Sequence, residues 1–379
     1  MTGKKRILFR FLVLPFLVAL LMPFTVKDWM FEHHFSSLYY FLISFGISFG
    51  LIPIMYKVGT MLDITDKPGG RHIHMQVTPR TGGIAIFIAF ITGLNLITIH
   101  SAELRAFFFA SIIIGVMGIL DDIRRLPALI KLIGQILAAT ILIANGFIFS
   151  FIPDESAYRF FSILLTYVWI IGITNAFNFL DGLDGLCAGV AVVVLLFYAI
   201  ISNFINDTYM LMICMVLAGS VLGFLLYNFR PRKRALLFLG DMGSTFIGFS
   251  IAALSIFGHW GYNKFTDLAI PIILLAVPIT DMTLATVVRL AKKKVRTLGQ
   301  LLKYTGTDHF HHRLMHLGLS AKTAVIIIYI LTILMGLLCL LLWKSTIQDS
   351  LIALSMALII FYLITAFMIY QEKRNGDIK

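Results

Sequence analysis

Apolar runs long enough to cross a lipid bilayer recur along the whole of this 379-residue chain, and they constrain its fold more than any other feature. A transmembrane helix needs about 20 consecutive, mostly apolar residues. Hydrophobic residues make up 59% of the sequence and charged residues only 13%, whereas soluble domains carry about 25% charged residues. Lipid is the expected cover for so much apolar surface, so we predict an all-α, polytopic transmembrane helical bundle.

The apolar runs predict eleven or twelve membrane-spanning helices. The runs lie near residues 7–26, 36–56, 82–99, 105–120, 129–149, 159–178, 186–203, 208–228, 243–258, 267–288, 323–343 and 350–370. The run at 267–288 is expected to bend around Pro271 and Pro278, since a proline interrupts helical hydrogen bonding.

No segment between the runs is long enough for a soluble domain, and no internal repeat is evident. Residues 1–379 are therefore predicted to form one integral membrane domain. Its core is expected at 36–322, with accessory spans at 7–26, 323–343 and 350–370. The basic N-terminus could begin a signal peptide, but no small-residue cleavage site follows, so we expect a retained first helix.

The three cysteines all lie within apolar runs: Cys187, Cys214 and Cys339. They have no metal-ligand spacing and no clear pairing, so we expect them to pack as small hydrophobic side chains.

The basic residues predict the orientation of the bundle. All but five of the 31 Lys and Arg residues fall on the side of the membrane that holds the N-terminus. The five exceptions are Lys27, Arg105, Arg159, Lys264 and Lys344. Because Lys and Arg accumulate in cytoplasmic loops, both termini are expected in the cytoplasm. This rule also accounts for the net charge of +12 without a nucleic-acid partner.

Acidic and histidine side chains collect on that same predicted face. They are Asp121, Asp122, Asp181, Asp184, Asp241, Asp281 and Asp308, with His72, His74, His309, His311, His312 and His316. Ionisable groups near a membrane are costly and usually mark functional sites. Separate loops that contribute to one face predict an active site.

Two aspartate motifs favour a divalent cation. Asp121 and Asp122 are adjacent carboxylates that repel each other, which favours a bound cation or a raised pKa. Asp181 and Asp184 lie three apart in a glycine-rich stretch with Asn178, and such oxygen ligands suit magnesium with phosphate, or a sugar. The alternatives are solvated loop acids for the first pair and a polar turn for the second.

Asp241 is expected just before a helix N-terminus, where backbone amides and the helix dipole favour a metal-bound phosphate. A plain N-cap is the alternative. The basic run 230–234 is expected to anchor the chain at the membrane surface. The Gly- and Pro-rich stretch 66–83 is either a phosphate or nucleotide loop or a basic connector.

Three histidines in four residues, His309, His311 and His312, could bind a transition metal or a pyrophosphate. No cysteine accompanies them and the other motifs are rich in oxygen, so we favour phosphate contact. Asp281 and Arg289 lie eight residues apart near the same face. Asp281 is expected to pair with a nearby base or to support the site, without a chemical step.

Aspartates, a divalent cation and many bases at a membrane surface together predict phosphoryl chemistry. One substrate would be a water-soluble phosphate donor and the other a lipid acceptor. Attack of a lipid phosphate on the β-phosphate of a nucleotide sugar would give a lipid pyrophosphate sugar. The cation and the bases would offset the repulsion between the two anions.

These motifs, in this order from Asp66 to Leu319, resemble the polyprenyl-phosphate N-acetylhexosamine-1-phosphate transferases. The resemblance implies Asp121 and Asp122 as catalytic residues, the first as a base, and Asp241 and Asp181 as ligands of Mg²⁺, which Mn²⁺ could replace. It implies that the nucleotide, sugar and phosphates contact Asn178, Asp184, Lys131, Phe238, Arg71, His74, His309, His311, His312 and Arg313, with Phe238 stacked on the uracil.

The branch of that family is indicated by several motifs. His72, His74, the stretch 79–83 and the His-x-His-His-Arg-Leu form resemble the branch that transfers GlcNAc-1-phosphate. One departure is Gly306, which stands where an acidic residue is expected, and Asp308 is the candidate replacement. The implied substrates are UDP-GlcNAc or a related UDP-sugar and undecaprenyl phosphate, in the bacterial cytoplasmic membrane with the active site facing the cytoplasm.

The resemblance predicts the first step of a cell-envelope glycan, such as teichoic acid, O-antigen or another lipopolysaccharide component, and it allows a homodimer. The alternative within the family is phospho-N-acetylmuramoyl-pentapeptide transferase of peptidoglycan synthesis. The alternative outside it is a membrane transporter or lipid flippase. A transporter is expected to place charges near the bilayer midplane and to show paired repeats, and this sequence has neither feature.

Overall fold

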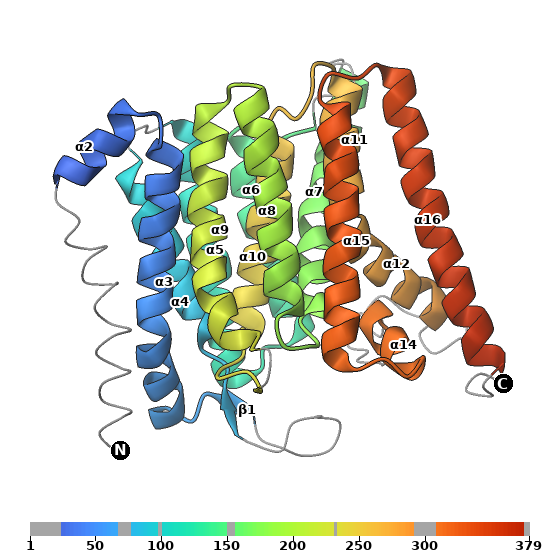
Figure 1. Cartoon of the computed structure of the whole chain (residues 1–379), viewed down its shortest axis with the longest axis horizontal. Helices are drawn as coiled ribbons and strands as arrows, with labels where there is room; N and C mark the ends of the chain where they lie inside the picture. The colour runs from blue at the N-terminus through green and yellow to red at the C-terminus, as the bar shows by residue number, and fades with distance from the viewer. Residues whose placement is uncertain are drawn as a thin grey trace.

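The structure is a computed structural model that describes residues 24–66, 77–97, 101–149, 156–230, 233–291 and 308–374. Long helices run between two ends of a bundle, with α16 at one edge (Figure 1). The helices are α2 (Phe24–Glu32), α3 (Ser36–Met61), α4 (Gly82–Leu96), α5 (Ala102–Arg124), α6 (Ala128–Ala144), α7 (Ser156–Leu180), α8 (Leu186–Phe204), α9 (Thr208–Asn228), α10 (Gly240–Phe257), α11 (Lys264–Leu274), α12 (Ala276–Ala291), α14 (Phe310–His316), α15 (Ala321–Leu342) and α16 (Ile347–Arg374). Strands β1 (Thr65–Asp66) and β2 (Thr78–Pro79) form a short antiparallel pair.

The predicted polytopic bundle is confirmed. Within the described residues, eight helices are long and apolar enough to cross a membrane. Helices α11 and α12 form a further pair bent by 68°, and α4 and α6 are shorter apolar helices. Each predicted run from residue 36 onward coincides with one of these elements. The first predicted span, 7–26, lies almost wholly outside the described residues.

Two smaller predictions are confirmed as well. The bend expected around Pro271 and Pro278 falls at the break between α11 and α12. The three cysteines are buried and unpaired within the helices, as small hydrophobic side chains are.

The observed helix ends locate the aspartates more precisely than the apolar runs of the sequence did. Helix α5 continues to Arg124, so Asp121 and Asp122 lie in its last turn. Helix α10 begins at Gly240, so Asp241 lies in its first turn and the prediction that it precedes the helix is wrong. No capping residue marks that start locally, because the cap of α10 comes from another helix.

Helix α10 is almost entirely buried, and two glycines let its neighbours approach its first turns. A Cβ on Gly83 of α4 would lie 2.3 Å from the backbone nitrogen of Gly243. A Cβ on Gly118 of α5 would lie 2.4 Å from the Cα of Met242. Small residues allow such close backbone packing between membrane helices. The ends of α4, α5 and α10 therefore converge at one point.

The predicted site residues that the structure describes gather at one end of the bundle. It is the lower end in Figure 1, where β1 and α14 lie. That end holds the last turns of α5 and α7 and the first turns of α8, α10 and α14. It is called the site end below.

Candidate active site

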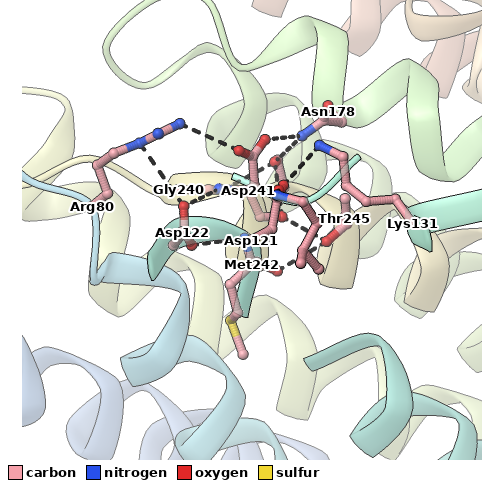
Figure 2. Close-up of polar contacts among 11 residues, drawn as sticks. Arg80, Asp121, Asp122, Lys131, Asn178, Gly240, Asp241, Met242 and Thr245 are labelled. Atoms are coloured by element: carbon pink, nitrogen blue, oxygen red, sulfur yellow. Dashed lines mark hydrogen bonds and ion pairs between the residues drawn. The ribbon is translucent and has the colours of Figure 1, made fainter. Parts of the chain in front are cut away.

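Three carboxylates from two helices form the centre of the site end (Figure 2). Asp121 and Asp122 come from the last turn of α5, and Asp241 comes from the first turn of α10. The charge of Asp241 acts on both of the other carboxylates. The packing of the helices is therefore consistent with the prediction that separate segments contribute these aspartates to one active site.

Asp122 caps the N-terminus of α10. Its two carboxylate oxygens accept the backbone N–H groups of Asp241, at 2.9 Å, and of Met242, at 3.0 Å. The first N–H groups of a helix have no partner within the helix, so this carboxylate satisfies two of them. Gly240 makes room for it with a φ of +79°, and a Cβ there would lie 2.7 Å from Asp122 Oδ2.

Asp121 has different partners from those of Asp122. Lys131 of α6 donates to its Oδ2 at 2.7 Å, and the backbone N–H of Leu126 donates to its Oδ1 at 2.7 Å. The side chain of Asp121 is only 3% exposed, whereas that of Lys131 is 28% exposed. Lys131, which the sequence placed near the diphosphate, is thus fixed beside the predicted base and keeps access to solvent.

Asp241 is the most accessible of the three carboxylates, with a quarter of its side chain exposed. Asn178 at the end of α7 donates to its Oδ1 at 2.8 Å and to the hydroxyl of Ser244 at 2.9 Å. Arg80 donates to its Oδ2 at 3.4 Å. Asn178, predicted from the sequence as a substrate contact, therefore orients the carboxylate that was predicted to bind the metal.

Arg80 is a site residue that sequence reasoning did not assign. Its guanidinium lies between Asp241 and Asp122, with its Nε 3.9 Å from Asp122 Oδ1. Burial opposes the charge of Arg80, but these carboxylates outweigh burial and raise the pKa of the guanidinium above its ordinary value. The available signal was the stretch 66–83, which was predicted as a phosphate or nucleotide loop or a basic connector, with no role for Arg80 itself.

Backbone pairing holds the Arg80 segment against the start of α10. The N–H of Phe238 donates to the carbonyl of Pro79 at 2.7 Å, and the N–H groups of Gly82 and Gly83 donate to the carbonyls of Phe238 and Leu239. A Cβ on Gly82 would lie 2.6 Å from the carbonyl oxygen of Phe238, so only glycine fits there. Phe238, predicted to stack on the uracil, lies half-buried in this pairing.

The Asp181–Gly185 loop between α7 and α8 is tied to the segment before α10. Asp184 accepts the N–H of Ala235 at 2.9 Å, and Asn228 accepts the N–H of Gly185 at 2.6 Å. Desolvation by the surrounding chain, and then the charge of Asp241, raise the pKa of Asp181 to about 8. Asp181 is thus a carboxylate that a nearby cation would stabilise, whereas Asp184 is occupied by a backbone contact.

The histidine motif is built around Asp281. Its Oδ2 accepts from His309 Nδ1 at 2.8 Å, and its Oδ1 accepts the N–H of Phe310 at the start of α14. Arg289 contacts the other ring nitrogen of His309 at 3.0 Å and Asp308 at 3.3 Å. These contacts confirm the expected pairing of Asp281 with a base, and they orient the His309 ring.

His311 lies against the Asp181–Gly185 loop. It is 1% exposed, and a Cβ on Gly182 would lie 2.4 Å from its Nε2. Burial lowers the pKa of His311 to about 3, so its ring is neutral at physiological pH. His312 is half-buried, and Arg313 is buried with its Nε donating to the carbonyl of Asp308. The histidine motif therefore borders the aspartate loop.

The predicted contacts Arg71 and His74, and also Gly306, lie outside the described residues. Every other predicted site residue lies at the site end of the bundle. They divide into the carboxylate cluster of Figure 2 and the histidine motif, with the Asp181–Gly185 loop between the two.

The residues at the site fit a magnesium ion only if it is bound as is usual in phosphoryl-transfer sites, with few ligands from the protein. Within the described ranges, no group of three or more His, Cys, Asp or Glu side chains is arranged to hold a metal ion alone. Mg²⁺ often takes one or two carboxylates and completes its shell with water and substrate phosphate. Asp241 and Asp181 would supply the two carboxylates, and Asn178 lies beside Asp241. These residues fit a magnesium ion whose coordination shell the diphosphate of the donor would complete.

Sequence comparisons identify the family. The sequence profile of glycosyl transferase family 4 matches residues 104–259. A probable undecaprenyl-phosphate N-acetylglucosaminyl 1-phosphate transferase of Bacillus subtilis is 35% identical over 338 residues, which cover 88% of this chain and 90% of that protein. The chain belongs to glycosyl transferase family 4.

Two further members of glycosyl transferase family 4 place the chain within it. A decaprenyl-phosphate N-acetylglucosaminephosphotransferase of Mycobacterium leprae is 32% identical over 320 residues, which cover 74% of this chain and 76% of that protein. A phospho-N-acetylmuramoyl-pentapeptide-transferase of Listeria monocytogenes is 30% identical over 252 residues, which cover 59% of this chain and 76% of that protein. The chain thus aligns over more residues with the proteins from Bacillus and Mycobacterium, whose names include N-acetylglucosamine, than with the protein from Listeria.

Membership in glycosyl transferase family 4 confirms the predicted resemblance and the predicted enzyme class. The transporter or flippase alternative is therefore wrong. The profile of this family spans α5 to α10, which carry Asp121, Asp122, Asn178, Asp181 and Asp241. Arg80 and the histidine motif lie outside that match, although the fold brings Arg80 into the carboxylate cluster and the histidine motif against the Asp181–Gly185 loop.

Proposed function

We propose that the chain transfers GlcNAc-1-phosphate from UDP-GlcNAc to undecaprenyl phosphate, giving a lipid pyrophosphate sugar and UMP. This would be the initiating step of a cell-envelope glycan. The family, and the names of the relatives from Bacillus and Mycobacterium, support a polyprenyl phosphate as acceptor and N-acetylglucosamine as the sugar. The muramoyl-pentapeptide alternative has less support, because its representative aligns with a smaller part of the chain.

The observation that carries the proposal is the pairing of Asp121 with Lys131 beside the more exposed Asp241. In the proposed step, an acceptor phosphate oxygen attacks the β-phosphorus of the donor and forms the new P–O bond. The bond from that phosphorus to the bridging oxygen breaks, and UMP leaves with the electron pair. A proton on the acceptor phosphate would pass to Asp121.

The other residues of the cluster support this step electrostatically. Lys131 and Arg80 carry positive charge on opposite sides of the cluster and would offset the charge of the phosphates (Figure 2). A magnesium ion held by Asp241 and Asp181 would supply further charge neutralisation at the donor diphosphate. Preorganised cations of this kind stabilise a phosphoryl transition state without reorganisation during the reaction.

The site end would face the cytoplasm of a bacterium, at the plasma membrane. The excess of Lys and Arg assigned to that side supports this orientation. The lipid acceptor would enter from the bilayer and the nucleotide sugar from the aqueous side. A homodimer would leave this arrangement unchanged, because each cluster is built within one chain.

The test is exchange of labelled UMP into UDP-GlcNAc by the purified protein with undecaprenyl phosphate and Mg²⁺. Exchange is expected with UDP-GlcNAc, and a panel of UDP-sugars that includes UDP-MurNAc-pentapeptide separates the two family branches. Asp121→Asn is expected to lower exchange by at least 100-fold, the usual range for loss of a general base. Absence of exchange with every UDP-sugar would overturn the proposal.

A further inference from the structure

Helix α15 reaches the aspartate loop although it lies outside the family profile at 104–259. Its residues fall in the predicted accessory span 323–343. The hydroxyl of Tyr329 on α15 donates to the carbonyl oxygen of Gly185 at 2.5 Å. Gly185 ends the loop that begins with Asp181, so this hydrogen bond joins an accessory helix to the candidate metal site.

The first turn of α8 is shaped to receive that phenol. A Cβ on Gly189 would lie 1.9 Å from the Tyr329 hydroxyl oxygen and 2.1 Å from its Cζ, so no other residue fits there without displacing the ring. The ring of Phe229 contacts Tyr329 edge-on, with centroids 5.9 Å apart. Two separate features, the glycine and the aromatic contact, therefore fix the position of Tyr329.

Gly185 is held through both of its backbone polar groups. Its N–H donates to Asn228 and its carbonyl accepts from Tyr329. Its φ of +83° is in the left-handed region, and a Cβ would lie 2.6 Å from the side chain of Phe229. Because Gly185 fixes where the chain turns into α8, these contacts set the path of the loop that presents Asp181.

We propose that Tyr329 is a positioning residue for the metal site, which holds Asp181 at the distance from Asp241 that a shared divalent ion requires. This inference rests on the proposed function, in which Asp181 and Asp241 bind the ion. Without the hydroxyl, the carbonyl of Gly185 keeps only the N–H of Gly189, which donates to it at 2.8 Å within the first turn of α8, and the loop gains freedom. Binding of the ion must then also order the loop that carries Asp181, and this loss of conformational entropy weakens the affinity for the ion.

The first experiment measures Mn²⁺ binding by electron paramagnetic resonance of the free ion, using the full-length purified protein without substrates. Tyr329→Phe removes the hydroxyl and keeps the ring against Phe229. We expect the dissociation constant for Mn²⁺ to rise about three- to tenfold, as expected for loss of one hydrogen bond. Tyr362→Phe on α16, where the tyrosine is 71% exposed, is the matched control and should leave binding unchanged.

The second experiment displaces the phenol from the other side of the contact. Gly189→Ala should weaken Mn²⁺ binding at least as much as Tyr329→Phe. Gly172→Ala in α7 is its control, because a Cβ there meets only an ordinary contact, 3.7 Å from Met282. If Tyr329→Phe loses thermal stability but binds Mn²⁺ like the parent protein, Tyr329 is a packing residue and the inference is wrong.

Activity separates this inference from the proposed function. With UDP-GlcNAc and undecaprenyl phosphate, Tyr329→Phe should need a several-fold higher Mg²⁺ concentration for half-maximal exchange. Saturating Mg²⁺ should restore most of the rate, and the KM for the lipid should not change. If the parent protein shows no exchange but Mn²⁺ binding still depends on Tyr329, then the proposed function fails and the positioning role stands.

Discussion

The carboxylate of Asp122 accepts the backbone N–H of Asp241 at 2.9 Å, so one of two adjacent aspartates on α5 holds the helix that carries the third. Its neighbour Asp121 has a different partner, the ammonium group of Lys131. The two aspartates, which look equivalent in sequence, therefore have different tasks. In the proposed function, Asp121 would take the proton of the acceptor phosphate, and Asp122 would act through the position of Asp241.

This division predicts different defects for the two amide variants. Asp122→Asn loses one of two accepted N–H bonds and should destabilise the protein by about 0.5–2 kcal/mol, the usual range for a lost helix cap. Asp121→Asn also weakens one acceptor contact, to Lys131 or to the N–H of Leu126, but it should lose far more UMP exchange than Asp122→Asn does. Thermal unfolding in detergent, followed for both variants beside the exchange assay, checks the prediction.

The same unfolding and exchange measurements can contradict this division between Asp121 and Asp122. If Asp122→Asn unfolds like the parent protein and loses as much exchange as Asp121→Asn, then Asp122 acts on the substrates. Partial recovery of exchange in Asp122→Asn at high Mg²⁺ would support its role through Asp241.

Helix geometry explains why the sequence could predict the cluster but not this division. Asp121, Asp181 and Asp241 each lie at the end of an apolar run, so hydropathy alone places them at one membrane face. Successive residues on a helix point about 100° apart, because a turn holds 3.6 residues. Asp121 and Asp122 therefore face different neighbours, and only the packing of α5 on α6 and α10 decides which.

Arg80 and Tyr329 were missed for a related reason. Arg80 meets Asp241 across 161 positions of sequence, and Tyr329 meets Gly185 across 144. No sequence pattern near either residue predicts its contact, because each contact depends on a glycine that allows close approach of two elements. The glycine is Gly83 in the first case and Gly189 in the second. The start of α10 was misplaced because its cap comes from α5.

Arg80 predicts a specific response to metal. The guanidinium offsets the charges of Asp122 and Asp241 in the protein without an ion. Arg80→Gln removes that charge, so the carboxylates should repel each other and the melting temperature without Mg²⁺ should fall. Added Mg²⁺ should then raise the melting temperature of Arg80→Gln by more degrees than it raises that of the parent protein.

Arg124→Gln provides the control for this comparison, because Arg124 lies exposed on the last turn of the same helix that carries Asp122. Its Mg²⁺-dependent shift in melting temperature should equal that of the parent protein. An equal shift in Arg80→Gln as well would show that Arg80 does not share the carboxylates with the ion.

His311 predicts a dependence of stability on pH. Burial holds its pKa at about 3 in the folded protein, against about 6.5 in an unfolded chain. Below pH 6.5 the unfolded state binds the extra proton, so stability should decline as the pH falls from 6.5 toward 3. Between pH 6.5 and pH 5 this amounts to about 2 kcal/mol at most, from the slope of about 1.4 kcal/mol per pH unit for one proton.

The measurement is thermal unfolding at pH 7.5 and pH 5 for the parent protein, His311→Gln and His316→Gln. His311→Gln should show a smaller loss of stability on acidification, because the titrating ring is gone. His316 is exposed on the same helix, so His316→Gln should behave like the parent protein. Equal losses in all three proteins would contradict a buried, neutral His311.

The orientation of the bundle can be tested with single cysteines, because the native ones are buried and should not react with a polar maleimide. Lys233 is exposed at the site end, between α9 and α10, and Tyr262 is 69% exposed at the opposite end, between α10 and α11. With the site end in the cytoplasm, a membrane-impermeant maleimide should label Tyr262→Cys in intact cells. Lys233→Cys should be labelled only after the membrane is opened. The reverse pattern would place the carboxylate cluster outside the cell, where a cytoplasmic nucleotide sugar could not reach it.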